Sequence, residues 1–120
     1  MSYVYIFIGG GLGSVIRFLI SKKLNYADIN ENFWPIGTFT INIISCFILG
    51  YILKWMQLHH SQTHHHLFFI VGLCGGMSTF STLIYEMFQF FSKGNIATGI
   101  LYSIISVLSG LMAIYAALKM

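Results

Sequence analysis

The sequence predicts an all-α membrane protein with four transmembrane helices, the third of them broken, and three observations lead to that fold class. Hydrophobic residues make up 57% of the 120 residues and charged residues 8%, which leaves too few polar side chains to cover a soluble domain. The apolar residues form four long blocks without the polar face of an amphipathic helix or strand. The third block also contains a run of glycine and hydroxyl residues that interrupts it.

The four blocks define the predicted helices, because a helix needs roughly 18 to 20 apolar residues to cross a bilayer. The first block has no basic residues before it, so we expect it to remain as a helix and not to be cleaved as a signal peptide. The connections are short, so residues 1–120 are expected to form a single transmembrane domain. The predicted helices span about residues 3–20, 36–55, 67–91 and 96–118.

The interruption in the third block, residues 72–82, predicts a helix break at membrane depth. Unpaired backbone groups are costly in hydrocarbon, so a break there must lie against protein or a polar cavity. The half-helix after the break would present free amides, which favour anions, and the half before it would present carbonyls, which bind cations. Because broken helices form ion sites in transporters, the segment predicts a small channel or transporter.

Three of the predicted helices carry polar side chains, which hydrocarbon tolerates only when they have partners. Such residues either join helices or line a polar track, and three aligned stripes favour the track. Asn42 can donate two hydrogen bonds to an anion. The positive ring edge of Phe80 can also face an anion, or the ring can simply pack against lipid or core. The stripes are Thr38, Asn42 and Ser45 on the second helix, Ser81, Thr82 and Glu86 on the third, and Tyr102, Ser106 and Ser109 on the fourth.

The pathway is expected to need a second subunit, because four short helices enclose too little volume for an ion path. Gly9 and Gly13 form a GxxxG pair, a spacing that lets helices approach closely. The pair supports oligomerisation and is also compatible with ordinary membrane packing.

The positive residues orient the chain only weakly. They favour loops one and three inside and both termini outside, by a margin small enough to fit insertion in both directions. One face has Arg17, Lys22, Lys23 and Lys93, and the other has Lys54 and Lys119.

Four motifs, in order along the chain, resemble the Fluc (CrcB) family of fluoride channels. Residues 9–18 resemble the first-helix glycine and arginine motif, and residues 37–42, ending at Gly50, resemble the second-helix motif. Residues 72–82 are similar to the third-helix signature, in which paired glycines precede a Thr-Phe-Ser-Thr run. The spacing of Tyr102, Ser106 and Gly110 resembles the fourth helix. The resemblance covers nearly the whole chain.

The resemblance implies a channel that passively exports fluoride across the bacterial plasma membrane and so reduces its cytoplasmic concentration and toxicity. It further implies an antiparallel, dual-topology dimer with two pores and a structural sodium ion (Na+) at the dimer interface. The backbone carbonyls of Gly75 and Ser78 would bind this ion, and Arg17 would lie near the pore mouth. The fluoride pathway would comprise Thr38, Asn42, Phe80, Ser81, Thr82, Glu86, Tyr102 and Ser106.

Leu83 departs from the family pattern, which has a second phenylalanine at this position. Phe80 and Leu83 lie three residues apart and so share a helix face, but leucine has no positive edge. We therefore expect at least one pathway of a homodimer to be impaired. The partner is then either a second copy or, as a heterodimer, a similar chain that supplies the missing ring.

Other functions also fit some of the residues. Glu86 is the only acid within a predicted span and could carry protons in a proton-coupled fluoride exporter. A small multidrug exporter shares four helices and dual topology, but its pattern has an acid in the first helix, where this chain has only Arg17. A non-transporting membrane assembly protein would not need the polar stripes or the break. No enzyme is expected, because no catalytic set can be assembled at one depth, and no basic patch suits nucleic acid.

The remaining titratable residues receive ordinary assignments. Cys46 and Cys74 fall within spans and are expected to be small apolar fillers. Asp28 and Glu31 are expected to be surface charges of the first loop. The five histidines of the second loop could bind a metal or sense pH, but a solvated polar loop is favoured since no acid or cysteine accompanies them. They are His59, His60, His64, His65 and His66.

Overall fold

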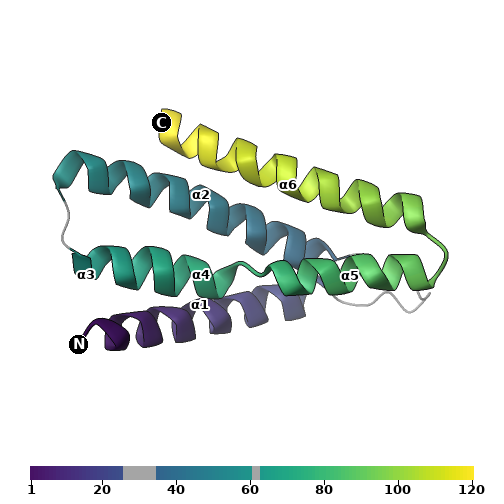
Figure 1. The fold of residues 1–120 in the computed structure, drawn as a ribbon, viewed down its shortest axis with the longest axis horizontal. Helices are drawn as coiled ribbons and strands as arrows, with labels where there is room; N and C mark the ends of the chain where they lie inside the picture. The colour runs from purple at the N-terminus through teal and green to yellow at the C-terminus, as the bar shows by residue number, and fades with distance from the viewer. Residues whose placement is uncertain (26–34, 61–62) are drawn as a thin grey trace.

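Four long helical segments run side by side in the computed structural model, which describes residues 1–25, 35–60 and 63–120 (Figure 1). All four are long and apolar enough to cross a membrane, as the sequence predicts. The third is built from four shorter elements in succession. The elements are α1 (Ser2–Leu24), α2 (Ile36–His59), α3 (Thr63–His65), the π-helix η1 (His66–Cys74), α4 (Gly75–Met77), α5 (Phe80–Ser92) and α6 (Ile96–Lys119).

The helices extend beyond the apolar blocks that predicted them. α1 continues to Leu24 and α2 to His59, each four residues past the predicted end, and the third segment begins at Thr63 instead of residue 67. Hydropathy reports only the part of a helix that lies in hydrocarbon, whereas the backbone hydrogen bonds continue into the polar interface. Lys22 and Lys23 in the last turn of α1 favour this extension, because positive charge complements the C-terminal end of a helix dipole.

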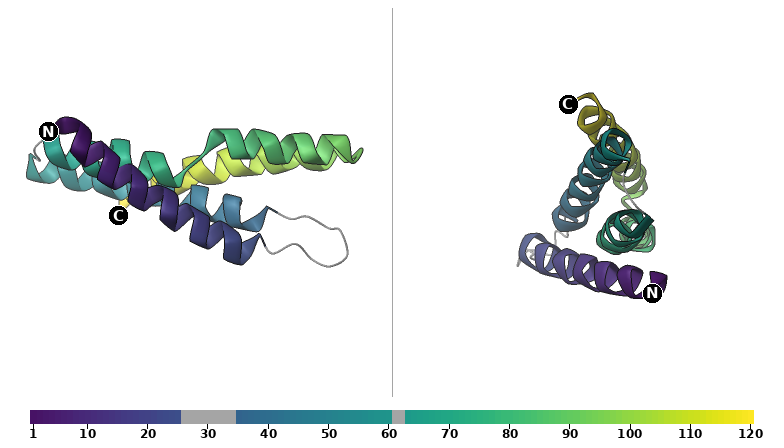
Figure 2. Two further views of the ribbon diagram at one scale, coloured as in Figure 1. Left: turned by 90° about the horizontal axis from the view of Figure 1, so that it is seen from below. Right: turned by 90° about the vertical axis from the view of Figure 1, so that its left-hand side faces the viewer.

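The third segment changes its packing partner at the break. Its first half, η1 and α4, packs along α1, whereas its second half, α5, packs along α6. α2 lies between, with its main contacts along α6 and others to α1 and η1. Figure 2 shows the change directly, because α5 runs beside α6 and away from α1 when the molecule is seen from below. The break therefore lies beside α2, between the half that packs on α1 and the half that packs on α6.

The glycines of α1 form a close crossing inside the chain. A Cβ added at Gly9 would lie 2.4 Å from the Phe68 carbonyl oxygen, and one added at Gly13 would lie 2.3 Å from the Leu73 carbonyl oxygen. Gly76 approaches α1 equally closely, since its Cβ would lie 2.5 Å from the Gly10 carbonyl oxygen. The expectation that the GxxxG pair supports oligomerisation is therefore wrong for Gly9 and Gly13. They pack α1 against η1 and α4 of the same chain.

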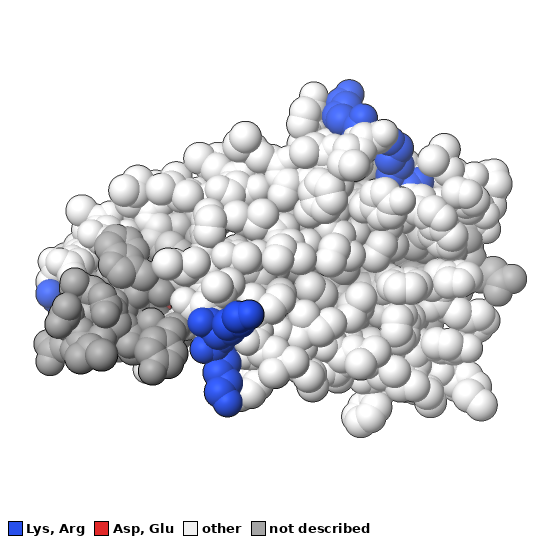
Figure 3. All heavy atoms as spheres, turned by 180° about the vertical axis from the view of Figure 1, so that it is seen from behind, with Lys and Arg blue, Asp and Glu red and all other residues white. Residues whose placement is uncertain are grey.

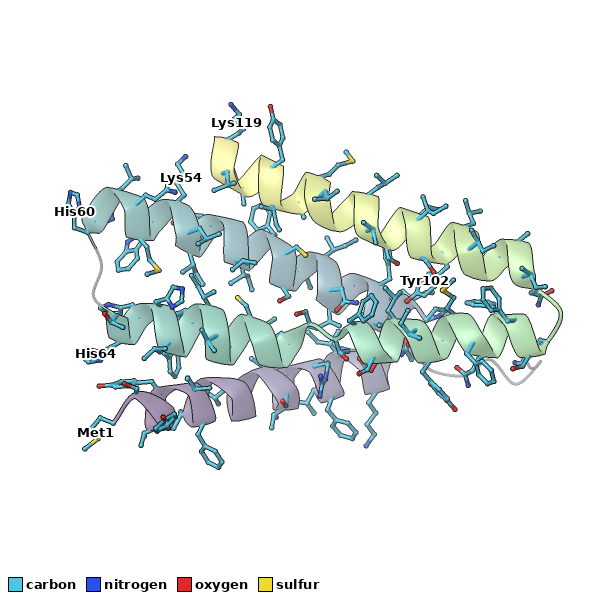
Figure 4. All side chains as sticks on the ribbon, viewed as in Figure 1. Met1, Lys54, His60, His64, Tyr102 and Lys119 are labelled. Atoms are coloured by element: carbon cyan, nitrogen blue, oxygen red, sulfur yellow. The ribbon has the colours of Figure 1, made fainter. Side chains whose placement is uncertain are left out.

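The outer surface is apolar over most of its area, as expected for a protein surrounded by lipid or by a second subunit. Large hydrophobic side chains are exposed on every long helix. Figure 3 shows Lys and Arg side chains in separate groups, with uncharged atoms over the broad face between them. Figure 4 places Lys54 and Lys119 toward the same end as Met1, His60 and His64. The predicted surface charges Asp28 and Glu31 lie outside the described residues.

Candidate functional site: the helix break and the polar chain beside it

The break consists of two residues in extended conformation, Ser78 (φ −85°, ψ 152°) and Thr79 (φ −150°, ψ 122°). Thr79 is the N-cap of α5, and its Oγ1 accepts a hydrogen bond from the Thr82 amide at 3.4 Å. The Thr79 amide donates to Oδ1 of Asn42, on α2, at 3.1 Å. A side chain of the neighbouring helix thus stabilises the break, and α5 begins next to the polar stripe of α2.

The carbonyl side of the break is also held by side chains. The Cys74 carbonyl accepts from the Ser78 amide, from the Ser78 hydroxyl and from the Ser45 hydroxyl, each at 3.1 Å. In a continuous helix the Thr79 amide would bond the Gly75 carbonyl. Because that amide donates to Asn42 instead, the Gly75 carbonyl has lost its helical donor.

A second polar group connects three helices through Glu86, which is only 2% exposed. Its Oε1 accepts from the Thr38 hydroxyl of α2, and its Oε2 accepts from the Tyr102 hydroxyl of α6 at 2.7 Å. Thr38 in turn accepts from Nδ2 of Asn25, at the end of α1, at 3.3 Å. Pairing both carboxylate oxygens offsets the high cost of burying this group. The hydrogen-bond chain Asn25–Thr38–Glu86–Tyr102 therefore joins every long helical segment.

A cavity of about 220 Å³ lies between this chain and the break. Its lining combines one positive side chain with hydroxyls, a carboxamide and the first turn of α5. Free amides and the positive end of the helix dipole make such a turn favourable for anions. The lining residues are Arg17, Phe18, Ser21, Asn25, Thr38, Ile41, Thr79 and Thr82.

The structure gathers some of the predicted pathway residues and separates others. Thr38, Glu86 and Tyr102 are hydrogen-bonded to one another, and Arg17 and Thr82 share the cavity with Thr38. Asn42 lies at the break with Oδ1 engaged, and its Nδ2 group makes no hydrogen bond to the described residues. Ser81 contacts the Thr79 hydroxyl at 3.1 Å. Ser106 is half-buried on α6, and its hydroxyl oxygen is buried without a hydrogen-bond partner among the described residues.

Phe80 and Leu83 lie in different surroundings although their spacing places them on one face. Phe80 is 75% exposed, whereas Leu83 is 8% exposed and belongs to the core. Phe80 therefore does not pack in the core of its own chain. Leu83 packs inside its own protomer.

Two residues of the site were missed in the sequence. Asn25 lies beyond the predicted end of the first helix and was not considered. Thr79 was part of the glycine and hydroxyl run but received no role, although a threonine ahead of an apolar helix is a common N-cap. The Thr79 cap was accessible to sequence reasoning, whereas the reach of Asn25 to Thr38 depends on how α1 and α2 meet.

Three histidines, His59, His64 and His65, lie away from this site and pack against aromatic rings. The ring of His59 stacks on Trp55 with centroids 5.0 Å apart, and the ring of His64 lies 5.0 Å from that of Tyr5. Within the described residues, no group of three or more His, Cys, Asp or Glu side chains could hold a metal ion. Cys46 is half-buried and Cys74 buried, and both are free thiols.

Comparison with known proteins identifies the family. The family model described as "CrcB-like protein, Camphor Resistance (CrcB)" matches residues 4–118. The chain belongs to the CrcB family. Similar proteins of this family are named as fluoride-specific ion channels and not as enzymes. The chain is thus a multi-pass membrane protein of a channel family, as its sequence predicted.

The relatives align with nearly all of the chain. The "Fluoride-specific ion channel FluC" of Azobacteroides pseudotrichonymphae is 39% identical, covering 89% of this chain and 85% of the relative. The protein of the same name from Bacteroides fragilis is 38% identical, covering 94% of this chain and 90% of the relative. "Fluoride-specific ion channel FluC 1" of Staphylococcus aureus is 35% identical, covering 100% and 96%.

Proposed function

We propose that this chain forms a fluoride-specific channel that exports fluoride passively and so lowers its cytoplasmic concentration. The observation that carries the proposal is the cavity at the start of α5, where Arg17 and several hydroxyls lie beside the capped break. A positive side chain and a helix N-terminus attract an anion. The names of the relatives supply the identity of the anion.

Hydrogen-bond donors along the proposed pathway would replace the water that fluoride loses. The Asn42 Nδ2 group, the hydroxyls of Ser81, Thr82 and Ser106, and the ring edge of Phe80 are the donors we assign to this role. Glu86 would act differently, because a carboxylate repels an anion. With Oε1 on Thr38 and Oε2 on Tyr102, it fixes the direction of those two hydroxyls.

The conducting form is proposed to be an antiparallel, dual-topology dimer. Phe80 is 75% exposed on the outside of the protomer, so this ring can line a pathway only if a second subunit covers it. Gly75 is also exposed, and a Cβ added there would meet no atom nearer than 3.8 Å, so a second subunit has room to approach it. Cysteine crosslinking of reconstituted protein would distinguish antiparallel from parallel pairs.

Gly75 and Ser78 are proposed to bind a structural Na+ through their carbonyls at the dimer interface. The break can accommodate such an ion. The Thr79 amide, which would bond the Gly75 carbonyl in a continuous helix, donates to Asn42 instead. Unwound backbone carbonyls are ligands for Na+ in broken transporter helices. When bound, the ion would supply fixed positive charge to the broken segment, and it would not move with fluoride.

Leu83 bears on which chain is the partner. Leucine offers no ring edge at this position, so we propose that a homodimer conducts less than a pairing with a similar chain that has an aromatic residue there. Fluoride efflux from liposomes containing this chain alone, compared with its Leu83→Phe variant, tests the idea. Equal efflux from the two proteins would remove the need for a heterodimer.

A fluoride electrode measures the proposed function directly in liposomes loaded with potassium fluoride. Valinomycin makes the membrane permeable to potassium, so a passive channel empties the vesicles without any imposed proton gradient. Chloride-loaded liposomes give the selectivity control. Vesicles that retain fluoride would contradict the channel, and efflux that requires a proton gradient would favour the proton-coupled exporter, in which Glu86 carries the proton.

A further inference from the structure

Asn25 belongs to none of the sequence motifs, yet it is the first member of the buried hydrogen-bond chain. Its Oδ1 accepts from the Gly37 amide at 2.6 Å, and its Nδ2 donates to the Thr38 hydroxyl at 3.3 Å. It also lines the cavity that contains Arg17. We propose that Asn25 is a positioning residue of the fluoride pathway. Its side chain sets the direction of the hydrogen bonds that run from Thr38 to Glu86, and this role rests on the proposed function.

The direction follows from which groups can donate. A backbone amide only donates, so Gly37 requires the oxygen of the Asn25 carboxamide to face it. The amino group of Asn25 must then face Thr38, whose hydroxyl accepts from it. A hydroxyl has one hydrogen, and that of Thr38 goes to Glu86. The Gly37 backbone amide thus fixes the orientation of two side chains between α1 and α5.

The packing around Asn25 is specific to this arrangement. A Cβ added at Gly37 would lie 2.8 Å from Asn25 Oδ1 and 2.8 Å from Ser21 Cα, so the approach needs a glycine. Thr38 and Glu86 are each 2% exposed, so most of their hydrogen-bond partners come from the protein itself. The Asn25 side chain therefore caps the N-terminal end of α2 and also donates a hydrogen bond to Thr38 of the pathway.

The consequence for conduction lies in where the Thr38 hydrogen points. Thr38 lines the cavity, so an anion that enters past Arg17 competes with Glu86 for that hydrogen. With Asn25 in place, the Thr38 lone pair that faces α1 is occupied and the hydrogen remains on Glu86. Without Asn25 the hydroxyl can turn toward the anion, which leaves the buried carboxylate with one donor fewer and a like charge close by.

A double-mutant cycle tests this role by fluoride efflux from liposomes. The proteins are the wild type, Asn25→Ala, Thr38→Val and the double variant, each checked for dimer content before reconstitution. We expect Asn25→Ala to lower the efflux rate about five- to tenfold, the factor for one lost hydrogen bond, and to cause no further loss when Thr38 is already valine. Equal losses in the two backgrounds would overturn the proposal, because Asn25 would then act only as a cap. Absence of efflux from the wild type would instead refute the proposed function.

Asn25→Asp gives a second test that preserves the cap, should Asn25→Ala fail to fold. An ionised carboxylate still accepts from Gly37 but cannot donate to Thr38, whereas a protonated one does both, as the carboxamide does. We expect low efflux at about pH 8 that recovers toward the wild-type rate only as the pH falls to about 4, where an aspartate of ordinary pKa gains its proton.

Controls for the pH series follow from the charged groups around Asn25. Arg17 of α1 lines the same cavity as Asn25, and Glu86 of α5 and Tyr102 of α6 belong to the same hydrogen-bond chain. Because these groups can themselves respond to pH, the wild-type rate is measured at each pH. Protein-free liposomes correct for leakage of hydrogen fluoride. An Asn25→Asp rate that equals the wild-type rate at pH 8, or that does not recover in acid, would show that no donor to Thr38 is needed.

Discussion

Replacing Gly13 with alanine is expected to destabilise the protomer by forcing α1 away from the broken third segment. The added Cβ would lie 2.3 Å from the Leu73 carbonyl oxygen and 2.9 Å from the Met77 amide nitrogen. Ordinary van der Waals contact begins at 3.4 Å, so the carbonyl would have to retreat by about 1.1 Å, the difference between the two distances. Both nearest atoms are backbone, so a side-chain rotation cannot relieve the contact.

The cost is estimated from overpacking, which destabilises cores by about 1 to 3 kcal/mol. A rigid backbone neighbour places this case at the upper end of that range. Alanine regains about 1 kcal/mol through its higher helix propensity than glycine. The net loss expected for Gly13→Ala is therefore about 1 to 2 kcal/mol, with the break displaced along with Leu73 and Met77.

Gly11→Ala is the matched control, because nothing within 4 Å of the added Cβ opposes it. It carries the same gain in helix propensity on the same helix without the collision. Thermal loss of the dimer peak on size exclusion in detergent measures both variants against the wild type, and liposome efflux reports on the pathway. If Gly13→Ala were as stable and as active as Gly11→Ala, the backbone crossing of α1 with η1 and α4 would not exist as described.

Three further substitutions separate the roles of the site residues. Asn42→Asp keeps the acceptor for the Thr79 amide but adds negative charge and removes the donors, so fluoride efflux should be lost. A conducting variant would contradict the assignment of Asn42. Tyr102→Phe removes one of two donors to Glu86 and should cost about 1 to 3 kcal/mol in unfolding experiments, whereas an unchanged midpoint would show that the bond is dispensable. Phe80→Leu alters a side chain that is 75% exposed in the protomer, so the protomer should still fold but efflux should fall several-fold. Undiminished efflux would remove the ring from the pathway.

The number of spans and the existence of the break could be predicted because both depend on local sequence. Apolar blocks of sufficient length define helices in a bilayer whatever their neighbours are. Adjacent glycines followed by hydroxyl residues that can cap a new helix favour an interruption of the backbone, which hydrocarbon tolerates only against protein or a polar cavity. The predicted interval, residues 72–82, accordingly contains the two extended residues, Ser78 and Thr79.

The features that depended on the packing of helices were not predictable in the same way. The GxxxG pattern reports that a helix approaches closely at Gly9 and Gly13 but does not say which helix, and the partner is the third segment of the same chain. Spacing places Phe80 and Leu83 on one face, yet α5 faces its own chain at Leu83 and the outside at Phe80. The role of Asn25 depends on α1 continuing beyond its apolar block, which hydropathy does not report.

The change of packing partner at the break accounts for why this interruption can exist in a membrane. Because η1 and α4 pack on α1 while α5 packs on α6, each half of the third segment is stabilised by a different helix and neither half needs to continue the other. The backbone groups at the junction then lie beside α2. Asn42 of α2 accepts a hydrogen bond from the Thr79 amide, and Ser45 donates one to the Cys74 carbonyl. The same stripe of α2 continues to Thr38, which donates to the buried Glu86 of α5. The polar face of α2 therefore stabilises the break and also forms the wall along which we expect fluoride to pass, so changes that weaken the first role should also weaken the second.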